Sequence, residues 1–443
     1  MKFNSITLKI GLLLLLTLLL QLPSTMVMNI ISERQSYQAD VAEELTQSIS
    51  GEQTIMGPIL VVPYQTTASA KPINEYILPK ELKINGNLTT ESLKRGIYHF
   101  QKYDSISSFT GHFDLSTIGK LKQSGKIIGT PYLAMGIKDP RGLNTVGEVM
   151  LNNQSFSFKP GTRLNSFTSG IHAPLTELNL AQKTTLDFAL NLNLTGTGRI
   201  AYVPIGENTA LQLEGNWPNP KFVGERSPST RNVTAQGFVA TWHSSWFANN
   251  LNQTFLDEEA NEATHNTLAD TTYSFDTELI QTVDHYQLNE RSVKYSILLV
   301  GMTFLCFFLF EVLKQLRVHP IQYALVGVAL SVFYLLLLAL SEQIGFKWAY
   351  VIASAACVTQ IGFYVSHILH SFKRGLYFSI FLGMVYTAIY ALLQSEDMAL
   401  LIGSIGLFIV ISIVMILTRR LNWYALVSGM EANKTDYSAH PPL

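Results

Sequence analysis

The sequence predicts a polytopic membrane protein with an N-terminal anchor helix, a large mainly β domain and a C-terminal bundle of about five transmembrane helices. Hydrophobic residues make up 47% of the 443 residues and charged residues only 14%, against about 25% charged in an ordinary soluble domain. Charges nearly vanish between residues 295 and 418, whereas residues 32–294 have a normal polar mix. The chain is therefore expected to occupy two environments, lipid and water.

Six segments approach the length that a helix needs to cross a bilayer core of about 30 Å, which is roughly 20 residues. They are residues 6–30, 295–313, 321–340, 348–369, 376–393 and 398–418. The first could instead be a cleaved signal peptide, because Lys2 and Lys9 precede or enter a Leu-rich run. We favour an uncleaved anchor, since no small-x-small cleavage site follows and apolar residues continue to Ile30.

The basic residues predict the orientation of these spans, because Lys and Arg resist translocation. With the N-terminus inside, the inner turns carry Lys2, Lys9, Lys314, Arg317, Lys373, Arg374, Arg419 and Arg420. The short outer loops carry a single basic residue, Lys347. Arg291 and Lys294 oppose the pattern, but they end a long translocated domain, where the rule is weaker. Both termini are then expected in the cytoplasm.

Four parts are expected: an anchor (1–31), an outer domain (32–294), a five-helix domain (295–420) and a cytoplasmic tail (421–443). The outer domain should open with a helix over 33–50. The pattern then changes to a period of two, most clearly in LDFALNLNL at 186–194, with Gly, Pro and Asn between the runs. This predicts an antiparallel, sandwich-like β domain. Residues 244–265 and 277–294 look helical or irregular.

Several classes of function lack a positive feature in the sequence. The net charge is −1 and there is no long Lys/Arg block, so no nucleic-acid partner is expected. No phosphate-binding glycine loop, HExxH or GxSxG motif occurs, and the histidines have no metal-ligand spacing. Cys306 and Cys357 lie in apolar runs and are interpreted as packing residues. We therefore expect no catalytic residue, no cofactor, no metal and no enzymatic activity.

Two candidate functional residues lie around the turn between the second and third spans. Glu311 is near the inner end of the second span, where an ionisable group is costly and is usually partnered. It could serve an ion or proton relay or contact a substrate, or it could form an interfacial pair with Lys314, Gln315 or Tyr323, which we favour. His319 precedes Pro320, which predicts a tight turn rather than a gating hinge.

The outer loops share a polar pattern, Ser-Glu-Gln at 341–343 and Ser-Glu-Asp at 395–397. These could be ordinary helix ends, or Glu342, Glu396 and Asp397 could form an acidic rim that docks the outer domain or meets a cation or peptide. We favour helix ends, and we keep these three with Glu311 and His319 as the candidate functional residues.

Aromatic and small residues add weaker expectations. An aromatic belt at the membrane interface is expected from Trp348, Tyr350, Trp423 and Tyr424. The deeper Tyr334, Tyr386 and Tyr390 need hydroxyl partners or a wet cavity. In the outer domain, core packing is favoured over glycan stacking for Trp217, Trp242 and Trp246. Close helix packing is expected at the small residues Gly327, Ser331, Ser379, Gly383 and Thr387.

Three stretches resemble the CreD (Cet) family of bacterial inner-membrane cell-envelope integrity proteins. They are SGEQTIMGPILVVPY at 50–64, WPNPKFVGERSPSTRNVTAQGFVATWHSSW at 217–246 and LVGMTFLCFFLFEVLKQLRVHPIQYAL at 299–325. The resemblance covers almost the whole chain. It implies a bacterial inner-membrane location with a periplasmic domain, a role in envelope integrity, and links to colicin tolerance and the β-lactam response. It implies no activity and no catalytic residues.

We therefore expect a non-enzymatic inner-membrane protein whose periplasmic domain binds an envelope protein, glycan or lipid, with the bilayer around its helices. The alternative is a transporter or flippase of an envelope precursor or small solute. Against it, Glu311 is the one carboxylate within the C-terminal spans, and helix-breaking signals at mid-membrane are weak. A third reading, an enzyme acting on a lipid-linked envelope substrate, has no assignable nucleophile.

Overall fold

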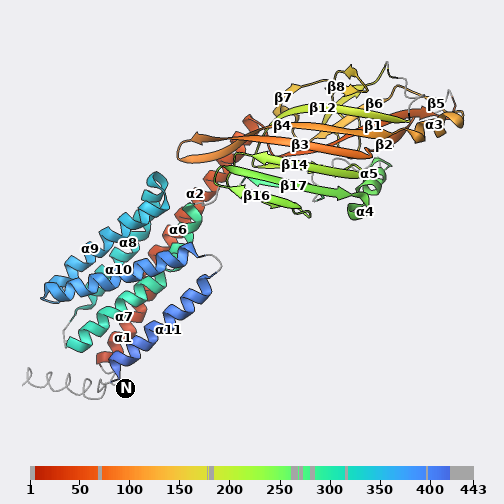
Figure 1. Cartoon of the computed structure of the whole chain (residues 1–443). Helices are drawn as coiled ribbons and strands as arrows, with labels where there is room; N and C mark the ends of the chain where they lie inside the picture. Colours follow the sequence, from red (N-terminus) through yellow and green to blue (C-terminus); the bar gives the residue numbers. More distant parts are fainter. Residues whose placement is uncertain are drawn as a thin grey trace, which may run out of the picture. The chain divides into compact units, whose positions relative to one another are not determined.

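The computed structural model divides the chain into two compact units, a helical unit (Met1–Tyr37 and Val283–Leu443) and a β unit (Gln38–Thr282). It describes residues 5–67, 72–176, 178, 184–260, 268, 273–279, 285–314, 318–395 and 398–419. Figure 1 shows an N-terminal helix, a mainly β middle region and a group of C-terminal helices. The predicted fold class is therefore confirmed.

The first sheet of the β unit has nine strands, with β1 (Gln53–Gln65) at its centre. The order is β10 (Lys159–Pro160), β11 (Gly170–Pro174), β6 (Tyr132–Ile137), β1, β13 (Arg199–Val203), β18 (Phe275–Leu279) and β15 (Pro220–Val223), while β2 (Ile73–Ile77) and β5 (Ile127–Ile128) also pair with β1. Residues 53–62 of β1 are all buried. This explains why the strand reads as a continuous apolar run rather than an alternation.

The second sheet also has nine strands, and its longest pairings join β3, β4 and β12. The order is β16 (Thr230–Thr234), β17 (Gly237–Ser245), β14 (Asn208–Gly215), β3 (Glu81–Arg95), β4 (Tyr98–Asp114), β12 (Thr185–Thr197), β8 (Val149–Leu151) and β9 (Gln154–Phe156), and β7 (Leu143–Val146) pairs with β12. Along β12, Leu186, Phe188 and Leu190 are buried while Asp187 and Asn191 are exposed. The predicted alternation is confirmed there.

Side chains from both sheets form one hydrophobic core, so the β unit is a sandwich. Most strand pairs are antiparallel, as predicted, but β1–β13 and β3–β14 are parallel. Parallel pairs need long crossover connections, which the local period of a sequence does not reveal. The unit also contains α3 (Ser116–Gln123), the 3-10 turn η1 (Pro140–Gly142), α4 (Trp246–Asn249) and α5 (Leu251–Ala260).

The outer-domain segment 277–294, which was expected to be helical or irregular, begins as a strand. Residues 277–279 belong to β18, which pairs with β13 and β15. Thr277 is fully buried opposite Ile200. Pairing on both sides of the strand supplies its hydrogen bonds, which composition alone did not indicate.

The helical unit contains eight helices within the described residues. They are α1 (Ser5–Leu19), α2 (Gln21–Ser48), α6 (His285–Lys294), α7 (Ser296–Lys314), α8 (Pro320–Ile344), α9 (Phe346–Ile368), α10 (Phe372–Gln394) and α11 (Ala399–Thr418). The break between α1 and α2 falls at Leu20, three residues before Pro23, which has no N–H to donate to the preceding turn. The helix predicted over 33–50 is the last part of α2.

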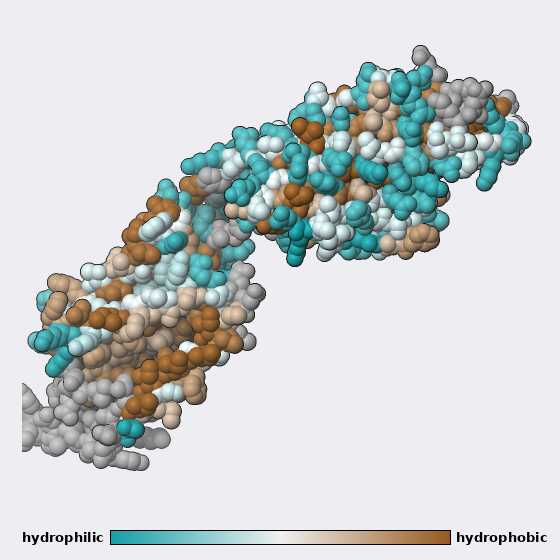
Figure 2. All heavy atoms as spheres, viewed as in Figure 1, coloured by the Kyte–Doolittle hydropathy of each residue, from teal (hydrophilic) through white to brown (hydrophobic). Residues whose placement is uncertain are grey.

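Within the described residues, four helical stretches are long and apolar enough to cross a membrane, namely α1 with α2 (Leu8–Ser48), α8, α9 and α10. A fifth span is possible if α6 and α7, which are bent by 44° at their junction, act as one. The apolar stretch Leu401–Ile416 of α11 is shorter. Figure 2 shows hydrophobic residues gathered on the helices and hydrophilic residues spread over the β unit.

Gly327 and Ser379, two of the small residues singled out from the sequence, lie at close contacts between helices. A Cβ on Gly327 of α8 would lie 2.2 Å from the Leu20 side chain, and one on Gly362 of α9 would lie 1.8 Å from Oγ of Ser379. At Gly383, by contrast, a Cβ would meet nothing within 4 Å. The small residues therefore fit the packing of α8 and of the α9–α10 pair, but Gly383 does not contribute to it.

Candidate functional site

A polar cluster of the helical unit, here called the Lys9 cluster, joins α1 to the turn between α7 and α8. Lys9 of α1 forms an ion pair with Oε1 of Glu311 in the last turn of α7, and its ammonium also donates to the Val318 carbonyl at 2.9 Å. The Val318 amide donates to Oε1 of Glu311 at 3.1 Å, and the Tyr323 hydroxyl donates to Oε2 at 2.9 Å. The side chains of Lys9 and Glu311 are 23% and 9% exposed.

This geometry satisfies both oxygens of Glu311. Buried charges are tolerated when they are paired and fully hydrogen-bonded, which is the case here. The Lys9 ammonium lies 5.9 Å from the centre of the Tyr323 ring, so a cation–π contact adds to the ion pair. An engaged carboxylate of this kind holds helices together, and it would have to break the ion pair before it could carry a proton.

The structure brings together two of the residues considered for Glu311 and adds one that was missed. Tyr323 is a partner, as one of the predictions had it, whereas Gln315 and the side chain of Lys314 lie outside the described residues. Lys9 was not expected, because it is 302 positions away along the chain. A signal did exist, since Lys9 and Glu311 are a lone cation and a lone anion within apolar segments.

His319 caps the helix that begins at the same turn. Its Nδ1 accepts a hydrogen bond from the Ile321 amide at 3.3 Å, and its own amide donates to Oε1 of Gln322 at 3.0 Å. This reciprocal arrangement is a capping box, with Pro320 at the first helical position. The cap requires Nδ1 without a proton, because only then can it accept. It supports a tight turn for His319-Pro320 without testing the hinge alternative.

Glu342 belongs to a second polar group, the Arg34 cluster, at the other end of α8. The Tyr286 hydroxyl of α6 donates to Oε1 of Glu342 at 3.1 Å, and Nε of Arg34 in α2 lies 3.7 Å from the same oxygen. Next to it, Nδ2 of the buried Asn289 donates to Oγ of the buried Ser341 at 2.7 Å. Glu342 therefore joins α2, α6 and α8 by polar contacts.

The acidic rim hypothesis also needed Glu396 and Asp397, which lie outside the described residues. Of the five candidate residues, the structure thus places Glu311 and His319 at one turn and Glu342 at the opposite end of α8. The Lys9 and Arg34 clusters do not share a residue.

Tyrosines and Cys357 form a third group between α8, α9 and α10. The Tyr386 hydroxyl donates to Sγ of Cys357 at 3.2 Å, and the Tyr350 hydroxyl donates to the Tyr386 carbonyl at 2.8 Å. Tyr350, which was expected in an interface belt, is 3% exposed and packs edge-on against Phe333, so its side chain is covered by protein. The Tyr334 hydroxyl is buried without a hydrogen-bond partner among the described residues.

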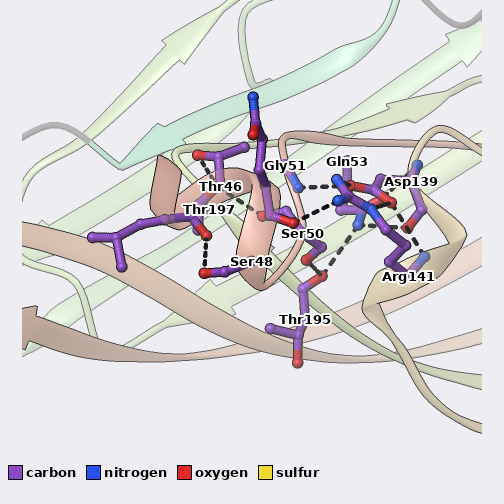
Figure 3. Close-up of polar contacts among 11 residues, drawn as sticks. Thr46, Ser48, Ser50, Gly51, Gln53, Asp139, Arg141, Thr195 and Thr197 are labelled. Carbon is purple, nitrogen blue, oxygen red and sulfur yellow. Dashed lines mark hydrogen bonds and ion pairs between the residues drawn. The ribbon is translucent and has the colours of Figure 1, made fainter. Parts of the chain in front are cut away.

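In the β unit, a hydrogen-bonded network fastens the end of α2 to the sandwich (Figure 3). The Gly51 amide donates to Oδ2 of Asp139 at 2.8 Å, and Ser50 Oγ donates to the Thr195 carbonyl at 2.7 Å. Arg141 forms an ion pair with Asp139 and holds the pKa of that carboxyl below its ordinary value. We call this the α2 clamp.

The clamp also covers the C-terminal carbonyls of α2. Nη1 of Arg141 donates to the Gln47 carbonyl at 2.7 Å, so a cation lies at the helix C-terminus, where it is favourable. Gly142 makes the close approach possible, because a Cβ there would lie 2.1 Å from the Thr195 carbonyl oxygen. No pattern in the sequence indicated this network.

The outer face of the second sheet carries a row of uncharged polar side chains across six strands. In register they are Asn191, Ser108, Asn85, Gln212, Thr241 and Thr230. Asn85, Asn191 and Gln212 are exposed, and their side chains have no hydrogen-bond partner among the described residues. At a strand spacing of about 4.8 Å, this amide row presents regularly spaced donors and acceptors to solvent.

A groove of about 380 Å³ lies beside the amide row, lined in part by Glu81, Lys83, Arg226 and His243. Its floor is formed by β3, β14 and β17. The groove therefore offers both charge signs next to neutral amides.

The tryptophans of the β unit serve the core, as favoured from the sequence. Trp242 is 1% exposed, and its ring lies 5.5 Å from that of Phe222 and 6.0 Å from that of Phe275. Trp217 and Trp246 are partly buried against the same core. Glycan stacking on Trp242 is excluded by its burial.

Among the described residues, no group of three or more His, Cys, Asp or Glu side chains could hold a metal ion. Cys306 and Cys357 are free thiols. The polar clusters of this part of the chain are thus ion pairs, caps and hydrogen-bonded amides.

Comparison with known proteins identifies the family. The family model for the inner membrane protein CreD matches residues 5–424. The inner membrane protein CreD of Escherichia coli (strain K12) is 36% identical over 428 residues, which cover 94% of each chain. The resemblance noted in the sequence is confirmed, and this chain belongs to the CreD family of inner membrane proteins.

Proposed function

We propose that this protein is a non-enzymatic component of the bacterial inner membrane that supports cell-envelope integrity and the response to envelope stress, including colicin tolerance and the β-lactam response. Its β unit would lie in the periplasm and bind an envelope component, and both termini would lie in the cytoplasm. The observation that carries the proposal is the Lys9 cluster, in which an ion pair joins the N-terminal helix to the other helices of the helical unit.

The Lys9 cluster supports retention of the N-terminal helix. With the helix in place Glu311 is 7% exposed and paired with Lys9. Cleavage would remove this cation and leave an unpaired anion within an apolar helix, which is costly. Glu311 of this cluster is also close in the sequence to Lys314 and Arg317, which the basic-residue rule assigns to the cytoplasm. Retention and the basic turns together favour an inside N-terminus.

The surface we propose for the envelope component is the amide row with its neighbouring groove. Exposed amides without partners are ready to form hydrogen bonds with a ligand, and the groove adds charges of both signs. The proposed surface does not bind its ligand by stacking on exposed aromatic rings, because the tryptophans pack into the core.

A photo-crosslinking amino acid in place of Gln212 tests this surface, with the same substitution at Gln123 as the matched control, since Gln123 is an exposed glutamine on α3. We expect one recurrent envelope species to be captured from Gln212 and not from Gln123. Asn85→Lys together with Asn191→Lys should remove that capture, because two cations replace neutral amides. Equal capture at both sites, or capture that survives the Asn changes, would contradict the assigned surface.

The role in envelope integrity is tested separately by complementation of a strain that lacks the gene. The wild-type chain should restore tolerance of envelope stress, and the Asn85→Lys/Asn191→Lys variant should fail although it accumulates normally. A variant that complements fully without capturing a ligand would contradict ligand binding as the basis of the function.

The transport alternative has less support. Glu311 was its main candidate residue, and the structure engages both of its oxygens. A relay or substrate site needs a carboxylate that can exchange partners.

A further inference from the structure

An apolar slot runs between α7 and α11 of the helical unit. Two adjoining cavities, of about 360 and 300 Å³, share Met302 and Leu305 of α7 and Val410 and Val414 of α11. Along α7 the lining extends from Ile297 to Phe310, which is about 20 Å at 1.5 Å per residue. This exceeds the thickness of one leaflet of the hydrocarbon core, about 15 Å.

The described residues do not close this slot. None of the described side chains of α11 (residues 401–416 and 418) is buried, although the helix is apolar on all sides. Packing cannot leave such a volume empty in a bilayer, because an unfilled cavity loses dispersion contacts on all of its lining. The occupant must therefore be apolar, flexible and present within the membrane.

One end of the slot is cationic. Tyr377 and Phe381 of α10 line the larger cavity of the slot. Lys373 lies one turn before Tyr377, about 6 Å along the helix. Arg419 follows Val414 by five residues at the end of α11, about 7.5 Å along the axis. Lys373 and Arg419 are exposed, and neither has an ion-pair partner among the described residues.

Other charges at this end do not neutralise the two cations. Arg374 adds a third positive charge and donates to the Leu369 carbonyl at 3.4 Å. The carboxylate of Glu311 is already engaged by Lys9, Tyr323 and the Val318 amide. The charge here is therefore complementary to an anion at headgroup level.

We propose that the slot binds an acyl chain of an anionic phospholipid, whose phosphate lies at the end of the slot that carries Lys373 and Arg419. In this arrangement the hydroxyl of Tyr377, a cavity-lining residue that is 65% exposed, would donate to an ester oxygen between chain and phosphate. A basic pocket between transmembrane helices is a recognised setting for anionic headgroups. The inference goes beyond the proposed function, and it needs membrane insertion but not the proposed orientation.

Native mass spectrometry of the delipidated full chain tests the proposal, with phosphatidylglycerol and phosphatidylcholine of the same acyl chains as probes and glycerol phosphate as a soluble competitor. We expect one phosphatidylglycerol to bind preferentially and glycerol phosphate not to displace it. Lys373→Gln with Arg419→Gln should weaken binding about 30-fold, from about 1 kcal/mol for each cation near a membrane surface. Lys347→Gln, at the start of α9, is the matched control and should have no effect.

A second variant tests the chain site. Leu305→Trp should fill the slot and abolish retention of both lipids, whereas Ile352→Trp, on an exposed apolar face of α9, should not. Equal binding of the two lipids by the wild type, or binding unchanged in Lys373→Gln/Arg419→Gln, would overturn the proposal. Lys373 and Arg419 are exposed, so the result for Lys373→Gln/Arg419→Gln can be interpreted even if the Leu305→Trp variant does not fold.

Discussion

The Lys9 and Arg34 clusters tie the same N-terminal segment to the same helix, α8, but they are built differently. Tyr323 and Glu342, the α8 members of the two clusters, are about 28 Å apart along the helix, close to the thickness of a bilayer core. The Lys9 pair is 23% and 9% exposed, with direct contact between the charges, whereas the Arg34 pair is 49% and 14% exposed at 3.7 Å. The closed cluster should therefore determine whether the N-terminal helix stays in place, and the open one should matter little.

The largest effect is expected from Glu311→Gln. This change leaves the Lys9 cation without its carboxylate, and an uncompensated buried charge costs about 3 kcal/mol. The fraction of folded monomer on size exclusion in detergent, and its thermal midpoint, should fall markedly. The double variant Lys9→Met/Glu311→Gln should recover most of the loss, because no unpaired charge remains.

Under the transport reading, that double variant would instead stay inactive although it is stable. If the double variant recovers both stability and the ability to complement, Lys9 and Glu311 serve to position the helices. A single Glu311→Gln variant as stable as the wild type would contradict the closed ion pair.

A smaller effect, about 1 kcal/mol, is expected from loss of the cap in His319→Ala. His319→Asn should retain most of the stability, because asparagine accepts the Ile321 amide hydrogen bond equally well. Comparison of the two thermal midpoints checks this. An equal loss in both variants would show that the imidazole acts other than as a cap.

The Arg34 cluster should respond less still. Arg34→Met should cost below about 1 kcal/mol, since exposed ion pairs contribute little. Raising the salt concentration should remove even this difference through screening, while the Glu311→Gln deficit persists. A loss of stability in Arg34→Met as large as that in Glu311→Gln would contradict the expected difference between the two clusters.

The smallest effect concerns a third ion pair, Asp139–Arg141 in the α2 clamp, where Arg141 is 56% exposed. Arg141 lowers the pKa of Asp139 in the folded state. A carboxyl with a lowered pKa adds stability above its unfolded value, about 3.9, and loses it as the pH falls through the folded value. The wild type should therefore lose more stability below about pH 4 than Asp139→Asn, in thermal melts from pH 6 to 3.

Much of the architecture could be predicted from local patterns. The alternation at 186–194 identified β12, and low charge with basic turns identified the apolar helices. The parallel pairs β1–β13 and β3–β14 could not be predicted, because their partners are joined by long connections.

The candidate site was predicted in part. The contact of Glu311 with Tyr323 was predicted, because the two residues are close in the sequence. The contacts of Lys9 with Glu311 and of Arg34 with Glu342 were not predicted, because these partners are remote from each other in the sequence. Spacing along a helix reveals neighbours at three and four positions only. The matching of a lone cation with a lone anion in apolar segments is the signal that would have found Lys9.

The proposed topology places the β unit and the basic turns on opposite sides of the membrane. Single-cysteine variants Gln212→Cys and Ser371→Cys, made with Cys306 and Cys357 replaced by serine, test this with a membrane-impermeant maleimide on spheroplasts. We predict that Gln212→Cys reacts in intact spheroplasts and that Ser371→Cys, in the turn before α10, reacts only after lysis. Labelling of Ser371→Cys before lysis, or protection of Gln212→Cys in intact spheroplasts, would contradict the proposed topology.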